Sequence, residues 1–136
     1  MSETLTGRCH CGGVSFTITG ARRSTCCHCS ICRRVTGAPF IEIVGVRGEQ
    51  SEVTVADGIT LNEYATSDYL TRMWCSRCGA GVYNAVQLDG RPEYRNFMIG
   101  LVDDRSAIPR SHHIYYADRT ADVGDDLPKF DAFGRP

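Results

Sequence analysis

The chain has 136 residues, and we expect residues 1–136 to form a single domain with a core of its own. Its 15 lysines and arginines nearly balance 16 aspartates and glutamates, giving a formal net charge of −1. This balance argues against a large basic surface, so we expect no nucleic-acid partner. No stretch approaches the roughly 20 apolar residues of a membrane span, so we expect no membrane partner.

Short alternating segments dominate the chain. Val14, Phe16 and Ile18 alternate with polar residues, which is the period of a half-buried strand. Segments 52–56 and 59–65 flank the turn pair Asp57-Gly58 and are predicted to form a hairpin. The further predicted strands lie at 39–46, 69–74, 80–86, 94–102 and 112–117.

Helical signals are few. A short helix is predicted from Ser30 to Val35, ended by Gly37 and blocked by Pro39. The tail, residues 122–136, is expected to be irregular and to lie on the surface. Repeated short strands with one or two short helices indicate a mainly β domain.

All eight cysteines lie in three stretches, "RCHCGG", "TCCHCSIC" and "WCSRCG". The first residues, "MSETLTGRCHC", are polar and lack the apolar core of a signal peptide. We therefore expect a cytoplasmic protein, where thiols stay reduced. In that compartment eight cysteines indicate metal binding before disulfides, and a disulfide framework is the alternative for an exported protein.

The first and third stretches together offer four thiolates. Cys9 and Cys11 are two residues apart, so an extended backbone points both to one face. Cys75 and Cys78 form a CxxC turn, which Gly79 allows to close. Four cysteines are the donor set of a closed, structural zinc site, which would join distant parts of the chain.

The second stretch contains Cys26, Cys27, Cys29 and Cys32. Adjacent residues of an extended chain project to opposite faces, so Cys26 and Cys27 do not easily bind one ion. The spacing favours an open site of Cys27, Cys29 and Cys32, with a fourth position free for water or substrate. A closed site that includes Cys26 remains the alternative.

An open three-thiolate zinc site suits the binding of a further thiolate, whose pKa the metal would lower. The resulting negative charge would favour nearby cations, and Arg33 and Arg34 follow the third cysteine directly. A solvated helix face is the alternative role for these arginines. His28 is expected to hydrogen-bond near the site rather than to bind metal.

The other histidines carry weaker signals. His10 lies between two expected ligands, and packing or exposure to solvent is its simplest role. His112 and His113 are neighbours in a predicted strand, so they face opposite ways. One of the two could lie near a site.

The motifs in this order resemble those of the glutathione-dependent formaldehyde-activating enzyme (GFA) family, which also includes centromere protein V. The matching segments are "GRCHCGGVSF", "CHCSICRRVTGAPF", "WCSRCGAGVY" and "HIYYADRTADVGDDLPKF", from residue 7 to about residue 130. Seven cysteines in the same order make the resemblance specific.

The resemblance implies a β-tent fold of short antiparallel strands with two Zn²⁺ ions per chain. It implies a structural zinc site of four cysteines and an open, catalytic zinc site of three. The implied ligands are Cys9, Cys11, Cys75 and Cys78 in the first site, and Cys27, Cys29 and Cys32 in the second.

Three functions follow as hypotheses. The first is a carbon–sulfur lyase acting on a small thiol adduct, as in the addition of glutathione to formaldehyde, with Arg33 and Arg34 binding the substrate. The alternative is a non-catalytic, zinc-stabilised binding module, and the third is a thiol or metal sensor that uses Cys26. Exposed β edges would also allow a homodimer.

Overall fold

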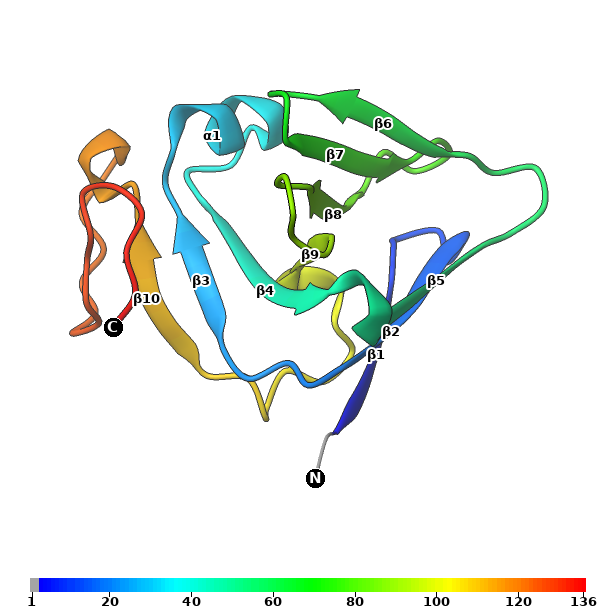
Figure 1. Ribbon diagram of the computed structural model, residues 1–136, viewed down its shortest axis with the longest axis horizontal. Coiled ribbons are helices and arrows are strands. Elements are labelled where there is room, and N and C mark those ends of the chain that lie inside the picture. The colour runs from blue at the N-terminus through cyan, green and yellow to red at the C-terminus, as the bar shows by residue number, and fades with distance from the viewer. Residues whose placement is uncertain (1–2) are drawn as a thin grey trace.

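The computed structural model describes residues 3–136 and confirms a mainly β fold. In this range it contains ten strands, one α-helix and three short 3-10 helices, and the strands form two sheets (Figure 1). The strands are β1 Thr4–Arg8, β2 Val14–Thr19, β3 Ser24–Cys27, β4 Ile41–Arg47, β5 Ser51–Val55, β6 Leu61–Ala65, β7 Leu70–Cys75, β8 Gly81–Val86, β9 Tyr94–Met98 and β10 Arg110–Ile114. The helices are α1 Ser30–Thr36, η1 Gly48–Gln50, η2 Ile99–Leu101 and η3 Tyr116–Asp118. Within residues 3–136, no helix has the length and apolar character needed to cross a membrane.

The smaller sheet has three antiparallel strands in the order β1-β2-β5. Its central strand follows the predicted alternation, because Val14, Phe16 and Ile18 are buried while the residues between them are not. The sequence analysis missed β1, a five-residue strand in which Gly7 lies directly beneath the ring of Phe16. A β-carbon at Gly7 would clash with that ring, so this position requires glycine.

The larger sheet has seven strands in the order β10-β3-β4-β9-β8-β7-β6. The edge strand β10 runs parallel to β3 and places Ile114 opposite Cys27. Every other neighbouring pair in this sheet is antiparallel. Strand β3 was also missed, because its four residues, Ser-Thr-Cys-Cys, lack a hydrophobic alternation.

The predicted hairpin across Asp57-Gly58 is wrong. The turn itself is present, and Gly58 has a positive φ of 80°. However, β5 pairs with β2 in the smaller sheet, whereas β6 pairs with β7 in the larger one. The segment between them therefore passes from one sheet to the other, which local turn chemistry does not reveal (Figure 1).

The main core lies between the two sheets. The ring of Phe97 on β9 is fully buried, 4.5 Å from the ring centre of Phe16 and 5.0 Å from that of Tyr83. Phe16 belongs to the smaller sheet and the other two to the larger, so these aromatic contacts hold the sheets together.

The predicted helix is confirmed as α1. Cys29 is its N-cap, and Gly37 ends it in a left-handed conformation with φ 73°. The backbone N–H of Gly37 donates to the carbonyl of Arg33, which closes the last turn. The tail after residue 118 has no further helix or strand, as expected, but its backbone pairs with β10.

Replacing Phe97 by Ala is expected to lower the free energy of unfolding by about 3–5 kcal/mol, because it opens a cavity between the sheets. Urea denaturation of the metal-loaded protein would measure this change. Phe133→Ala is the matched control, because Phe133 is 62% exposed and its loss should change stability by less than about 0.5 kcal/mol. Equal effects of the two substitutions would contradict the assignment of the core.

Candidate metal centres

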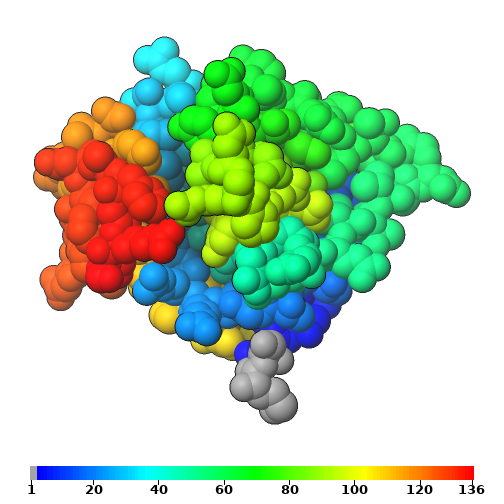
Figure 2. All heavy atoms as spheres, viewed as in Figure 1, coloured from blue at the N-terminus to red at the C-terminus, as the bar shows by residue number. Residues whose placement is uncertain are grey.

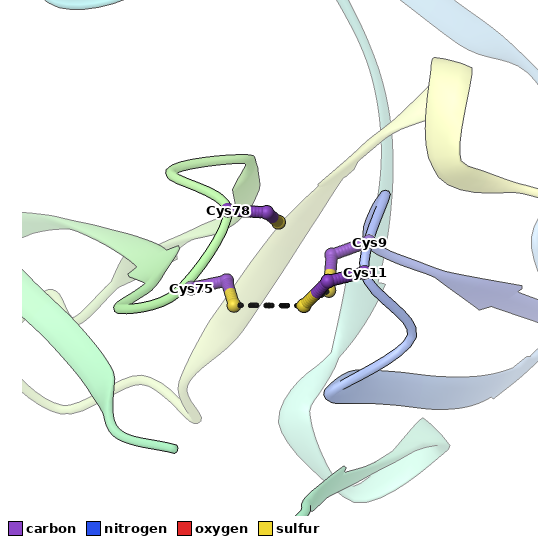
Figure 3. A group of neighbouring side chains, drawn as sticks. All are labelled: Cys9, Cys11, Cys75 and Cys78. Atoms are coloured by element: carbon purple, nitrogen blue, oxygen red, sulfur yellow. Dashed lines mark hydrogen bonds between the residues drawn. The ribbon is translucent and has the colours of Figure 1, made fainter.

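The structure brings Cys9, Cys11, Cys75 and Cys78 together (Figure 3). Their sulfur atoms all lie within 4.8 Å of one another, and Cys11 Sγ is 3.6 Å from the sulfurs of both Cys9 and Cys75. Four sulfurs around one tetrahedral zinc with bonds of 2.3 Å would lie about 3.8 Å apart. The four-cysteine cluster therefore fits a closed tetrahedral metal site.

Backbone N–H groups turn toward this cluster. Val14 N–H donates to Cys9 Sγ at 3.3 Å, and Gly13 N–H donates to Cys11 Sγ at 3.4 Å. A hydrogen bond from Arg77 and then that from Gly13 lower the pKa of Cys11 to about 6. Arg77 and the backbone of Gly13 thus stabilise the thiolate of Cys11, which is the form that binds metal, whereas burial raises the pKa of Cys9.

The second predicted group is also assembled. The sulfurs of Cys27, Cys29 and Cys32 lie within 4.8 Å of one another, with Cys27 and Cys32 3.5 Å apart. Cys27 ends β3, and Cys29 caps α1 by accepting a hydrogen bond from Cys32 N–H at 3.3 Å. The end of the strand and the start of the helix therefore form one three-cysteine cluster.

Cys26 lies apart from this cluster. It is fully buried on the other face of the sheet, opposite Glu42 and His113 in the strand register. Burial raises the pKa of its thiol to about 12, so it stays protonated. The structure therefore forms the open three-cysteine arrangement, as the alternation argument favoured, and not the closed one.

Arg72, which the sequence analysis did not single out, is the cation at this cluster. Its Nη1 donates to Cys32 Sγ at 3.5 Å, and its Nε donates to Thr66 Oγ1 at 3.4 Å. The side chain is only 7% exposed, so its charge acts in a weakly screened environment. The one signal in the sequence was that Arg72 lies inside the predicted strand 69–74. A guanidinium that is buried in a strand needs a negatively charged partner.

The predicted arginines of α1 differ in their surroundings. Arg34 is exposed and lines a pocket of about 670 Å³ that Arg72, Trp74 and Met98 also line. Arg33 does not line this pocket, and its Nε is buried without a hydrogen-bond partner among residues 3–136. Of the two, Arg34 therefore shares a cavity with the buried cation of the three-cysteine cluster.

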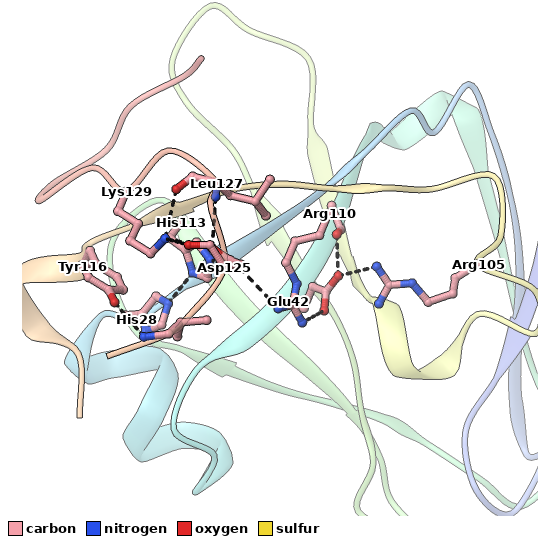
Figure 4. Close-up of polar contacts among 11 residues, drawn as sticks. His28, Glu42, Arg105, Arg110, His113, Tyr116, Asp125, Leu127 and Lys129 are labelled. Atoms are coloured by element: carbon pink, nitrogen blue, oxygen red, sulfur yellow. Dashed lines mark hydrogen bonds and ion pairs between the residues drawn. The ribbon is translucent and has the colours of Figure 1, made fainter. Parts of the chain in front are cut away.

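His28 and His113 form a buried pair behind the cluster, on the face that carries Cys26 (Figure 4). Their Nε2 and Nδ1 atoms lie 2.8 Å apart, and His113 Nε2 lies 2.8 Å from Asp125 Oδ2. Lys129 Nζ donates to the other oxygen of Asp125 at 2.8 Å. His28 is thus a hydrogen-bonding neighbour outside the sulfur group, as predicted, and it is tied to the C-terminal segment.

Burial, followed by the charge of His113, lowers the pKa of His28 to about 4. His28 is therefore neutral at pH 7. Its ring stacks on Phe40, with centres 4.7 Å apart, and packs edge-on against Tyr116. These contacts fix the backbone between Cys27 and Cys29.

The remaining histidines stand apart from both clusters. His112 is buried on the opposite side of β10 from His113, as predicted, with its ring 5.8 Å from that of Phe130. His10 is exposed and is not a member of the four-cysteine cluster.

Tyr115 is a second residue that sequence reasoning missed. Among residues 3–136 it is the only non-glycine residue with positive φ, at 51°. It follows Ile114, whose carbonyl accepts the N–H of His28. Burial, and next the charge of Cys27, raise the pKa of its hydroxyl. A left-handed backbone is costly for a tyrosine, and residues strained in this way cluster at functional sites.

Glu42 anchors the same region from β4. Its carboxylate accepts hydrogen bonds from Arg105 at 2.6 Å, Arg110 at 2.8 Å and Ser24 at 2.5 Å (Figure 4). Burial alone would raise the pKa of Glu42, but the bonds from Arg105, Arg110 and Ser24 together lower it to about 2.

This depressed pKa predicts a pH-dependent contribution to stability. Glu42 stabilises the fold above its unfolded-state pKa of about 4.3, and the contribution is lost as pH falls toward 2. The stability difference between wild type and Glu42→Gln should therefore be constant from pH 7 to 5 and shrink below about pH 4.5. Urea titrations at each pH would measure it, and a difference that is independent of pH would contradict the ion pairing.

Loss of one ligand from the four-cysteine cluster should release its metal and detach the smaller sheet. We expect Cys75→Ser to lower the metal content by one ion per chain and to reduce cooperative unfolding, as a strong chelator should do to the wild type. Elemental analysis and circular dichroism would measure both effects. Cys26→Ser is the matched control, since Cys26 belongs to neither cluster, and an unchanged metal content in Cys75→Ser would refute the site.

Comparison with known proteins supports this picture at the level of the family. A curated relative, the uncharacterized lyase C29B12.13 of Schizosaccharomyces pombe, is 26% identical over 91 residues. The match covers 66% of this chain and 64% of that protein, so the chain spans slightly less than two thirds of the relative's length. A crystal structure of a Rhodobacter sphaeroides protein is 25% identical, with a TM-score of 0.50, and the match covers 78% of this chain and 99% of that one.

The profile of the glutathione-dependent formaldehyde-activating enzyme family matches residues 4–118, which include all the cysteines of both clusters. The match spans most of the sequence, and the fold brings the cysteines of its motifs into two groups that can hold metal. The chain therefore belongs to the glutathione-dependent formaldehyde-activating enzyme family.

Proposed function

We propose that this chain is a zinc-dependent carbon–sulfur lyase that acts on the adduct of a small thiol with an aldehyde, as in the formation of S-hydroxymethylglutathione from glutathione and formaldehyde. In the forward direction the sulfur bonds to the carbonyl carbon and the thiol proton ends on the carbonyl oxygen. The reverse direction breaks the same carbon–sulfur bond. The observation that carries the proposal is the three-cysteine cluster, which has Arg72 on one sulfur and a pocket of about 670 Å³ beside that arginine.

The proposal includes two zinc ions per chain. The four-cysteine cluster would hold a structural ion, and Cys27, Cys29 and Cys32 would hold a second one. The sulfur spacing and the all-thiolate donor sets support zinc over metals that prefer oxygen ligands. Zinc bound by three thiolates leaves a position for a fourth sulfur and lowers the pKa of a thiol that occupies it.

The protein's own side chains would balance the negative charge of the thiolates and would contact the substrate. Arg72 holds a positive charge against the thiolate of Cys32, and Arg34 adds a second at the rim of the same pocket. Arg33 does not line this pocket, and its role in binding substrate stays a prediction from the sequence. Tyr115 supplies a hydroxyl, whose raised pKa keeps it protonated and able to donate to a developing alkoxide oxygen.

The proposed substrate determines the partner and the cellular compartment that we expect. The proposed partner is a small thiol such as glutathione, and the proposed compartment is the cytoplasm, where glutathione keeps thiols reduced. The homodimer remains a prediction from exposed strand edges.

Two-dimensional exchange NMR can test the proposal directly. Catalytic amounts of the zinc-loaded protein should speed the exchange between glutathione, formaldehyde and their adduct by at least about tenfold over buffer. The physical reason is that zinc at the three-cysteine cluster would lower the pKa of the glutathione thiol. Cys29→Ala should lose this effect while keeping the four-cysteine metal.

Cys26→Ser is the control for this experiment, since a buried thiol on the other face should not affect the exchange. An unchanged exchange rate with the wild-type protein would refute the lyase proposal. The chain would then be a zinc-stabilised binding module.

A further inference from the structure

The C-terminal segment, residues 119–136, runs along the outer edge of β10. His113 N–H donates to the carbonyl of Pro128 at 2.9 Å, and Phe130 N–H donates to the carbonyl of His113 at 3.0 Å. In Figure 2 this segment (red) lies on the surface beside the orange segment near residue 115. The family profile ends at residue 118, so the segment lies beyond that match. It nevertheless reaches the three-cysteine cluster through buried side chains.

A line of side-chain hydrogen bonds, here called the histidine relay, leads from Lys129 through Asp125 and His113 to His28 (Figure 4). Lys129 Nζ donates to Asp125 Oδ1 at 2.8 Å, and Asp125 Oδ2 lies 2.8 Å from His113 Nε2. His113 Nδ1 in turn lies 2.8 Å from His28 Nε2. Both rings are at most 1% exposed, so water does not compete for these bonds.

The carboxylate at one end of the relay sets the direction of every bond in it. The hydrogen bond from Lys129 lowers the pKa of Asp125, so this carboxylate is ionised at neutral pH and can only accept. His113 Nε2 therefore carries a proton and donates to Asp125. His113 Nδ1 is then left to accept, and the donor is the Nε2–H of the neutral His28. Asp125 thus determines which nitrogen of each ring is protonated.

The relay ends on the residue between two of the clustered cysteines. The ring of His28 is held by His113, and its backbone N–H donates to the carbonyl of Ile114 at 3.1 Å. His28 lies behind the cluster, whereas the sulfurs of Cys27 and Cys29 meet within it. Because both the ring and the backbone of His28 are held, the backbone that carries the two cysteines is held as well. Hydrogen-bond partners outside a ligand set commonly change metal affinity by about 10- to 100-fold.

We propose that Asp125 is a positioning residue for the three-cysteine metal site and that, through the histidine relay, it holds Cys27 and Cys29 at the spacing at which they bind zinc. This inference rests on the metal site of the proposed function, but it does not depend on the lyase activity. It makes the C-terminal segment a working part of that site. If the same contacts served stability alone, their loss would weaken the whole domain without distinguishing the two cysteine clusters.

Asp125→Asn tests the relay because it keeps the shape of the side chain and removes its charge. Lys129 would take the amide oxygen, so the amide NH₂ would face His113 Nε2 and force the proton of that ring to Nδ1, against the Nε2–H of His28. The dissociation constant of zinc at the three-cysteine cluster should rise at least about tenfold. Competition with a chromogenic chelator would measure it, and the zinc of the four-cysteine cluster, whose affinity should not change, is the internal reference.

Two further variants complete the zinc measurement. Cys29→Ala identifies which of the two zinc ions belongs to the three-cysteine cluster, because it should lose that ion alone. Asp122→Asn is the matched control, since Asp122 lies in the same segment but pairs with Arg119 at 2.7 Å outside the relay. This control should bind both zinc ions as the wild type does.

The proton position can be measured without any variant. Nitrogen-15 NMR of the wild type should show His113 protonated at Nε2 and not at Nδ1. A proton on Nδ1, an unchanged zinc affinity of the three-cysteine cluster in Asp125→Asn, or equal weakening at both clusters would each overturn the inference. Selective weakening by Asp125→Asn, in a protein whose wild type fails to catalyse exchange, would refute the lyase proposal alone and leave the relay standing.

Discussion

The four-cysteine cluster is the constraint on which the arrangement of the two sheets depends. Cys9 and Cys11 lie between the first two strands of the smaller sheet, while Cys75 ends β7 of the larger one and Cys78 lies in the turn to β8 (Figure 3). The cluster thus joins residues 64 positions apart, from Cys11 to Cys75, and offsets the entropy of closing that loop. The smaller sheet also packs on the larger one through Phe16 and Phe97, so the cluster and this aromatic contact hold the same two sheets together.

Strand β7 connects the two clusters physically. Arg72 contacts Cys32 of the three-cysteine cluster, and Cys75, three residues later on the same strand, belongs to the four-cysteine cluster. The position of the buried guanidinium therefore depends on a strand that the other site holds at one end. The four-cysteine cluster thereby helps to position the charge beside the three-cysteine cluster, although no residue is shared between them.

The sequence predicted the features that depend on residues close together in the chain. The CxC, CxCxxC and CxxC spacings and the α1 boundaries at Ser30 and Gly37 predicted ligand groups and a helix that the structure contains. Alternation along β3 separated Cys26 from Cys27. The features that were missed are long-range: β6 pairs with β7 instead of β5, and Arg72 contacts Cys32 across 40 residues. No pattern of neighbouring residues predicts contacts between such distant parts of the chain.

The parallel pairing of β10 with β3 has a consequence for how the chain folds during its synthesis. Until residue 114 has left the ribosome, β3 is an unpaired edge that carries Cys26 and Cys27 at its end. Such an edge is a template for wrong pairing between nascent chains, and long-range pairings of this kind form slowly. Strand β10, near the C-terminal end of the chain, therefore completes the larger sheet by covering the edge of the cysteine-rich strand β3.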